Sequence, residues 1–294
     1  MKNYLIDFLK KFEFPLDSHK AFTDAFDKIA SKEEYLSRFK SLLKIYADDM
    51  DCDYVKLVDD GDLLASECGV HPYTFKIILH IFMAEILRGY YKRKNIPESY
   101  WYDSMLDLRY QAETCKLVKD IWGAFCGYWF IYFFQLKRFS FGRLQIEIID
   151  FNREYDKNGL VLSKDSKVFN VHIPRTGGKL DKNEVDRAYE DAMEFYKKYF
   201  NFNSNVFFCH TWLLFPDNLS VLKPDSNMAK FINDYDVFEV ELKDDYQELY
   251  RLFDMEYTGD VSVLPTNTSL QRAYIEWIKQ GKKIGIGCGI HIHH

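Results

Sequence analysis

The cysteines of this sequence form none of the patterns that bind metal or build a disulfide framework. Six cysteines are scattered along 294 residues, and no two of them are spaced as CxxC. A small secreted domain shows a dense, regular set of cysteines, and a zinc site shows closely spaced ones. The sequence therefore predicts reduced thiols, a cytoplasmic location and no metal site.

An excess of basic residues is also missing. The 39 Lys and Arg residues are outnumbered by 45 Asp and Glu residues, so that the formal net charge is −6 at pH 7. Binding to nucleic acid draws much of its free energy from Lys and Arg side chains on phosphates. We therefore expect no nucleic-acid partner.

No apolar run is long enough to cross a bilayer. The most apolar stretch, residues 121–136, contains Trp, Tyr and Gln side chains and falls short of the ~20 residues that a spanning helix needs. The first segment, MKNYLIDFLKKFEFP, carries charges inside its apolar pattern, which is untypical of a secretory signal. We interpret residues 121–136 as buried core and expect no membrane partner.

Aromatic residues are abundant, and in the first half the apolar residues recur at helical spacing. The chain contains 21 Tyr and 25 Phe, enough for a substantial core. Ser31 to Glu34 has the pattern of a capping box, which predicts a helix continuing through Tyr46. Further helices are predicted over residues 72–91 and from Pro97 onward. No segment of this half alternates as a strand does.

After about residue 138 the apolar period changes to two. The alternation of RFSFGRLQIEIIDF shifts phase at Gly142, which we interpret as a β-bulge. NREYDKNG has the composition of a turn. Strands are predicted at KVFNVHIP, NVFFCHTWLLF, VFEVEL and KKIGIGCGIHI, separated by helices that begin near Asp181, Ser226, Tyr246 and Thr268.

This change of period divides the chain into two domains. Residues 1–130 are predicted to be a helical domain, and residues 131–294 a sheet domain of α/β or α+β type, because strands and helices alternate there. The change itself falls between residues 122 and 138.

A glycine loop joins one predicted strand to a helix in FNVHIPRTGGKLDKNEV. Unpaired N–H groups and the dipole at a helix N-terminus attract anions, and glycines let the backbone come close. Residues 175–179 therefore have the parts of a phosphate cradle, although the spacing is neither that of a Walker loop nor G-x-G-x-x-G. From this loop alone, a plain strand-to-helix turn is the alternative.

The order of elements around this loop resembles the central region of the GNAT acyltransferase superfamily. There the loop binds the pyrophosphate of coenzyme A with the pattern Q/R-x-x-G-x-G/A. Arg175 and Gly178 match its first two positions, and Leu180 departs from the last. The segments FGRLQIEI, VHIPRTGGKLD, CHTWLLFP, PDSNMAKF and LPTNTSLQRAYIEWIKQG are similar to bacterial acyltransferase-domain proteins that pair an N-terminal helical domain with a GNAT-like C-terminal domain.

The resemblance implies an α+β chain in which a helical domain accompanies a GNAT-like mixed sheet flanked by helices. It implies acetyl-CoA or another acyl-CoA as cosubstrate, no metal, and direct transfer of the acyl group to a small polar acceptor. The sequence leaves the oligomeric state open, with a homodimer as one possibility. The residues expected to bind the cofactor are Ile173, Arg175, Thr176, Gly177, Gly178, Lys179 and Asn227.

Direct transfer needs a base beside the cleft between two parallel strands, expected at FNVHI and VFFCHTWLL. Glu147 and His172 project from neighbouring strands on corresponding faces and are the first candidates. The alternative for Glu147 is a salt bridge with Arg143 or another neighbour on a solvent-facing sheet surface, and for His172 a hydrogen-bonded sheet histidine. His210 is the third candidate, either lining the cleft or hydrogen-bonded in the core.

Cys209 and His210 are adjacent but cannot form a catalytic pair with each other, because neighbouring residues on a strand point to opposite faces. Cys209 is expected to be a buried structural cysteine. A hydrolase that uses Cys209 with a base from another element is a competing hypothesis. Another hypothesis is a non-catalytic GNAT-like module that binds a small ligand or a protein partner. It is motivated by Leu180, which departs from the last position of the CoA-binding pattern.

Three further features have a plain structural interpretation. Ser226 is expected to cap the helix that begins at Asn227, with contact to pantetheine as the alternative, and Thr268 to cap the last helix. The terminal histidines are spaced closely enough to bind metal, but without acidic or cysteine ligands nearby they are expected to form a mobile tail.

Overall fold

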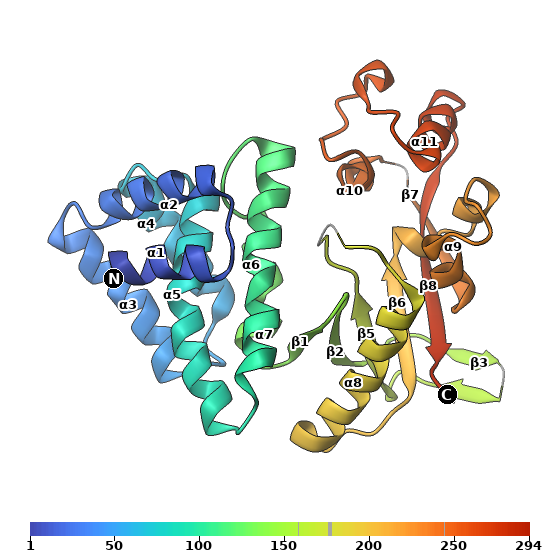
Figure 1. Ribbon diagram of the computed structural model, residues 1–294, viewed down its shortest axis with the longest axis horizontal. Helices are drawn as coiled ribbons and strands as arrows, with labels where there is room; N and C mark the ends of the chain where they lie inside the picture. The colour runs from blue at the N-terminus through green and yellow to red at the C-terminus, as the bar shows by residue number, and fades with distance from the viewer. Residues whose placement is uncertain (158, 176–177, 244) are drawn as a thin grey trace. The chain divides into compact units, whose positions relative to one another are not determined.

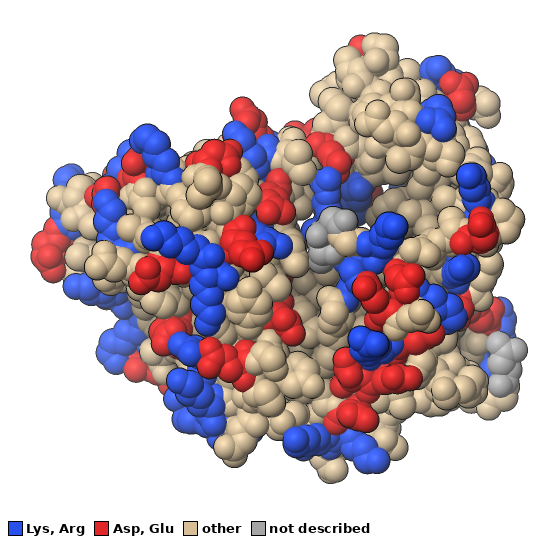
Figure 2. All heavy atoms as spheres, viewed as in Figure 1, with Lys and Arg blue, Asp and Glu red and all other residues tan. Residues whose placement is uncertain are grey.

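The computed structural model describes residues 1–157, 159–175, 178–243 and 245–294, and of Gln247 only the backbone. The chain divides into two compact units, Met1–Phe139 and Ser140–His294. No helix in the described part of the chain is both long and apolar enough to cross a bilayer. On the face of the second unit in Figure 2, basic and acidic side chains are interspersed.

The first unit contains helices and no strand up to its last two residues, which begin the first strand (Figure 1). No strand occurs before Arg138 in this fully described region, as the sequence predicts. Pro97 precedes α6, and Pro72 is the first residue of α5, whose His71 cap accepts a hydrogen bond from the N–H of Tyr73. The helices are α1 (Lys2–Lys11), α2 (Leu16–Ile29), α3 (Glu33–Asp48), α4 (Tyr54–Glu67), α5 (Pro72–Arg93), α6 (Glu98–Lys119) and α7 (Ile131–Phe134), with the 3-10 turn η1 (Gly127–Phe130) before α7.

The capping box predicted at Ser31 is wrong. Helix α3 begins after Lys32, and no side chain caps it. The hydroxyl of Ser31 instead donates to the carbonyl of Lys28, 2.7 Å away, at the end of α2. Two helices follow each other so closely that the serine serves the end of one rather than the start of the next.

The second unit contains a six-stranded mixed sheet in the order β1-β2-β5-β6-β8-β7. The central strands β5 and β6 are parallel, and β8 is antiparallel to both β6 and β7. A separate hairpin consists of β3 and β4. The strands are β1 (Arg138–Phe141), β2 (Leu144–Asp150), β3 (Tyr155–Lys157), β4 (Leu160–Leu162), β5 (Lys167–His172), β6 (Val206–Thr211), β7 (Asp236–Lys243) and β8 (Ile284–Ile292).

The structure corrects three sequence-based interpretations of these strands. Gly142 is no bulge but lies, with φ of 53°, in the two-residue turn between β1 and β2, where glycine adopts a positive φ without strain. The segment NREYDKNG contains β3 rather than turn alone. The strand predicted over residues 205–215 ends at Thr211, because residues 212–214 form the 3-10 turn η2 (Trp212–Leu214).

Helix α8 (Lys182–Phe200) connects β5 to β6 and covers one face of the sheet (Figure 1). Its Tyr196 hydroxyl donates to the carbonyl of Ile146 on β2 at 2.7 Å, and the ring of Tyr189 lies 4.4 Å from that of Phe207 on β6. On the opposite face, Phe151 and Phe208 form a second apolar cluster with residues of the β3–β4 hairpin.

The remaining helices follow β6 and β7 and build their own apolar cluster at one end of the sheet. The last of them, α11 (Ser269–Lys279), begins with the predicted capping box between Thr268 and Gln271, and the Tyr274 hydroxyl donates to Oδ1 of Asn218 at 2.9 Å. The other elements are η3 (Pro216–Ser220), α9 (Asn227–Asn233), η4 (Gln247–Leu249), α10 (Tyr250–Phe253) and η5 (Val261–Val263).

Candidate active site

The pairing of β2 with β5 places a set of polar side chains on the sheet face opposite α8. The two strands are antiparallel, with Glu147 opposite Asn170 and Gln145 opposite His172. Side chains two residues apart on a strand share a face. The ring of Phe169 on β5 lies 5.3 Å from that of Tyr196 on α8, so the next residue, Asn170, projects from the other face together with its partner Glu147 and with His172.

These three side chains meet at one carboxylate oxygen. Oε1 of Glu147 lies 2.8 Å from Nε2 of His172 and 2.9 Å from Nδ2 of Asn170. An ionised carboxylate only accepts hydrogen bonds, so a bond from His172 to Glu147 requires the proton to be on Nε2. The same Nε2 atom lies 3.0 Å from Nδ2 of Asn170. In a neutral imidazole with the proton on Nε2, the lone pair is on Nδ1. The sequence placed Glu147 and His172 within reach of one another, and the structure brings them into contact.

Burial separates the roles that the two groups can play. The side chain of Glu147 is 5% exposed and that of His172 is 23% exposed. A buried carboxylate needs hydrogen-bond donors around it, and His172 and Asn170 supply them. Glu147 therefore does not lie on a solvent-facing surface, and its pairing with Arg143 stays a prediction.

The strands on which a cleft was expected are parallel, as predicted. Phe169 pairs with Phe207, and Asn170 with Phe208. Beyond this paired part, the thiol of Cys209 donates to the carbonyl of Val171, with Sγ 3.4 Å from the oxygen. Cys209 is fully buried, and this burial raises the pKa of its thiol. A neutral, inaccessible thiol is a poor nucleophile, so the geometry does not favour the hydrolase hypothesis.

His210 lies two residues beyond Phe208 and projects from the same sheet face as Asn170 and His172. Its Nε2 atom is 3.4 Å from a carboxylate oxygen of Glu241 on β7. Burial lowers the pKa of His210, and the charge of Glu241 opposes this lowering. The side chain is 33% exposed, so His210 is a surface-facing histidine with an acidic partner rather than a core histidine.

One group of three side chains in the described residues could converge on a cation. The ligand atoms of His210, Glu241 and Cys288 all lie within 4.8 Å of one another. The carboxylate of Glu241, however, already accepts hydrogen bonds from Arg153 at 3.2 Å and Lys243 at 3.1 Å. Two cations thus neutralise the carboxylate that would have to bind a metal. The expected absence of a metal stays a prediction.

The glycine loop is held from two sides. Arg143, in the turn before β2, donates from Nε to the carbonyl of Lys179 and from Nη1 to the carbonyl of Pro174, both at 3.1 Å. The guanidinium of Arg175 forms a two-pronged ion pair with Asp254, in which Nη2 lies 2.7 Å from Oδ2. Of the predicted cofactor ligands, Thr176 and Gly177 lie outside the described residues.

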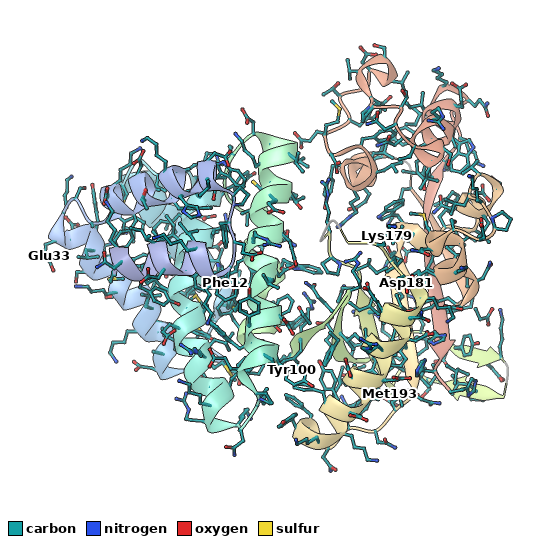
Figure 3. The ribbon with its side chains drawn as sticks, in the orientation of Figure 1. Phe12, Glu33, Tyr100, Lys179, Asp181 and Met193 are labelled. Atoms are coloured by element: carbon teal, nitrogen blue, oxygen red, sulfur yellow. The ribbon has the colours of Figure 1, made fainter. Side chains whose placement is uncertain are left out.

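The helix that follows the loop begins as predicted. Asp181 caps α8, and its Oδ1 atom accepts a hydrogen bond from the N–H of Asn183 at 3.0 Å. Lys179 and Asp181 lie beside the N-terminal end of this helix in Figure 3. Lys182 pairs with Asp186 and Asp234, both at 3.0 Å. The loop therefore leads into a capped helix N-terminus, and the basic residues Lys179 and Lys182 lie near it.

The outlying candidates have structural partners. Ser226 caps α9 through a hydrogen bond from the N–H of Ala229 at 3.2 Å, as predicted, and Asn227 is the first residue of that helix. The prediction that the terminal histidines form a mobile tail is wrong. His291 belongs to β8, and its Nδ1 atom lies 2.8 Å from the carbonyl of Asp234, while the N–H of His293 donates to the carbonyl of Asn205.

Two parts of this site were missed from the sequence. Arg143 lies 31 and 36 residues before its two carbonyl partners, and Asp254 lies 79 residues after Arg175. The helical pattern before Asp254 gave no sign of such a contact. Asn170 was placed on the correct face, but its bond to Glu147 depends on a register that only the folded sheet sets.

A mixed sheet with two parallel central strands, joined through a glycine loop and a capped helix, is the architecture of a GNAT-type acyltransferase domain. Comparison with family models agrees, since a GNAT-like C-terminal domain matches residues 138–291, and an N-acyltransferase N-terminal domain matches residues 3–136. The chain belongs to the family of proteins with a GNAT-like C-terminal domain.

Solved structures of acyltransferases share this fold. A complex with decanoyl-CoA has a TM-score of 0.80 and 20% sequence identity, and a complex with decanoyl-CoA and teicoplanin has 0.78 and 18%. An acyltransferase mutant in complex with octanoyl-CoA also has 0.78 and 18%. Each of these alignments covers 98% of this chain and 87% of the chain in the solved structure. Comparison with curated proteins found no match.

Proposed function

We propose that this protein transfers an acyl group from an acyl-CoA thioester directly to an amine of a small polar acceptor. The observation that carries the proposal is the contact of His172 with buried Glu147 beside the parallel strands β5 and β6. The match to an N-acyltransferase N-terminal domain supports the type of bond formed. The structural neighbours with octanoyl-CoA and decanoyl-CoA support the donor.

In this reaction His172 is the general base. The acceptor nitrogen attacks the thioester carbonyl while Nδ1 of His172 takes a proton from that nitrogen. Glu147 stabilises the imidazolium through its bond to Nε2, as the carboxylate does in other acid–histidine pairs. The carbon–sulfur bond then breaks, its electron pair stays on sulfur, and the thiolate receives the proton. The products are an amide and CoA.

The loop at residues 173–180 is the proposed site of the diphosphate. Amide groups at the start of α8 and the helix dipole favour an anion there. The proposed ligands are Ile173, Arg175, Gly178 and Lys179, together with Thr176, Gly177 and, on α9, Asn227. His210, on the same sheet face, is the second candidate for the base.

The acceptor is proposed to be a small molecule rather than a protein or a nucleic acid. Two solved structures of this fold are acyltransferase complexes with teicoplanin and with 10C-teicoplanin, so a glycopeptide amine is one acceptor to examine. The mixed surface charge and the acidic balance of the chain are consistent with an uncharged or cationic amine rather than a polyanion.

The test combines binding and turnover. Octanoyl-CoA at about one hundred times its Kd is expected to stabilise the protein by about 2.7 kcal/mol, and Arg175→Ala and Gly178→Asp are expected to abolish this shift. Release of free CoA thiol is then followed against a panel of amino sugars and glycopeptides, with the amide confirmed by mass. Absence of binding at millimolar CoA overturns the proposal. Binding without turnover on any amine favours the non-catalytic module.

A further inference from the structure

Arg143 connects the sheet to both ends of the glycine loop. It occupies the second position of the turn Gly142–Arg143, directly before β2. From there its guanidinium donates to the carbonyls of Pro174 and Lys179, which flank residues 175–178. One side chain thus sets the distance between the point where the loop leaves β5 and the point where it approaches α8.

These two bonds also set the direction of two amide groups. A trans peptide holds its N–H opposite its C=O in one plane. Because the carbonyls of Pro174 and Lys179 point at Arg143, the N–H groups of Arg175 and Leu180, which share those peptide planes, point away from it. Amides that are already oriented bind an anion at a lower entropic cost than amides that must be ordered.

We propose that Arg143 is a positioning residue for the diphosphate of the acyl-CoA, acting through the loop backbone. The proposal rests on the proposed function, since it concerns the same loop. Its role differs from that of Arg175, which is a proposed ligand of the diphosphate and whose guanidinium pairs with Asp254. Arg143 instead uses its fork of donors on two backbone carbonyls.

The forked geometry of the guanidinium allows the positioning role of Arg143 to be tested separately from the effect of its charge. Arginine presents donors in a fixed planar arrangement, whereas lysine presents one compact ammonium group. Arg143→Lys keeps the positive charge near the loop but cannot keep both bonds in this geometry. If Arg143 acted only through its charge, lysine would replace it. If it acts by holding Pro174 and Lys179, lysine fails almost as fully as Arg143→Gln.

The experiment measures the Kd of octanoyl-CoA and of S-octanoyl-pantetheine, which lacks the diphosphate, for wild type, Arg143→Lys and Arg143→Gln. We expect both variants to weaken octanoyl-CoA by about tenfold or more, corresponding to the loss of one or two hydrogen bonds. The Kd of S-octanoyl-pantetheine is expected to change less than about twofold, because this ligand has no diphosphate for the loop to bind. A general structural defect would instead raise the Kd of both ligands.

Arg272→Lys is the matched control. Arg272 also donates from its guanidinium to a backbone carbonyl, that of Thr266 at 2.7 Å, in the same unit. Its replacement is expected to leave the Kd of octanoyl-CoA unchanged. Hydrogen exchange of residues 173–181 without ligand gives a second readout, in which both Arg143 variants are expected to exchange faster than wild type.

The outcomes separate this role from the proposed function. Wild type that binds octanoyl-CoA, with Arg143→Lys binding equally well, overturns the positioning role and leaves the transferase intact. Equal losses for both ligands likewise overturn it, because they indicate a general loss of structure. Wild type that binds no CoA ester overturns the role and the proposed function together.

Discussion

Nε2 of His172 lies 2.8 Å from Oε1 of Glu147 across two antiparallel strands, and the carboxylate is the more buried of the two groups. In the proposed reaction His172 meets the substrate, and Glu147 holds the tautomer of its imidazole. We expect His172→Gln to lower kcat about 10²- to 10⁴-fold, the range for loss of a general base. The Kd of octanoyl-CoA is expected to stay within about twofold of wild type.

Glu147→Gln is expected to lower kcat less than His172→Gln, because the amide oxygen can still accept from Nε2 but no longer balances the imidazolium charge. Asp150→Asn is the matched control, since Asp150 ends the same strand and pairs with exposed Lys167. It is expected to leave kcat unchanged. An unaltered kcat in His172→Gln would remove this residue as the base and turn attention to His210.

Asp254 is expected to compete with the ligand for Arg175. The carboxylate engages both terminal nitrogens of the guanidinium, and a diphosphate would need the same donors. Asp254→Asn should lower the Kd of CoA by up to about fivefold, since an exposed ion pair is worth at most about 1 kcal/mol. The positive φ of 60° at Asp254 is one that asparagine adopts readily.

Calorimetry at two salt concentrations measures this effect. The gain is expected to shrink at high salt, where exposed charges are screened. Glu248→Gln is the control, because Glu248 pairs with Arg251 in the same segment and is not placed at the loop. A higher Kd in Asp254→Asn would mean that the ion pair supports the binding conformation instead of competing with the ligand.

Cys209 is expected to resist alkylation in the folded protein. Burial raises the pKa of its thiol, so that little thiolate forms at neutral pH, whereas Cys126 is exposed. Peptide mass spectrometry after a time course with iodoacetamide should show Cys126 modified well before Cys209. Cys209→Ala should keep transferase activity. Labelling of both cysteines at one rate, or activity lost with Cys209, would revive the hydrolase hypothesis.

The helical unit is expected to lose stability in acid through His80. This side chain accepts from the Tyr54 hydroxyl, donates from Nδ1 to the carbonyl of Lys76 at 2.6 Å and is fully buried. Burial lowers the pKa of His80 from 6.5 to about 4. The unfolded chain therefore binds the proton more readily, and stability is lost as pH falls from 6.5 through 4.

The loss expected over this window is about 3 kcal/mol, because each unit of pKa difference contributes about 1.4 kcal/mol. Urea unfolding at pH 7, 6, 5 and 4 measures it. The double variant Tyr54→Phe/His80→Phe removes both polar partners and is expected to show a flatter dependence on pH. If the free energy of unfolding fell equally with pH in the double variant and in wild type, the loss would be due to groups other than His80.

Local sequence determined much of the secondary structure. Thr268 with Gln271, Asp181 and the prolines at positions 72 and 97 start helices where predicted, because a cap or a fixed φ acts within one turn. Alternation predicted β5 and the face that Asn170 and His172 share. Where two elements compete for one residue, as at Ser31, local pattern was not sufficient.

The sequence by itself determined the helical first half, the alternating strands and helices of the second, the capped helix after the glycine loop and the identity of the polar residues near it. Only the tertiary structure decided that Glu147 is buried against His172, that Arg143 holds Pro174 and Lys179, and that Asp254 occupies Arg175. Periodicity and caps depend on neighbours within a few residues, whereas strand register and loop docking bring together groups tens of residues apart.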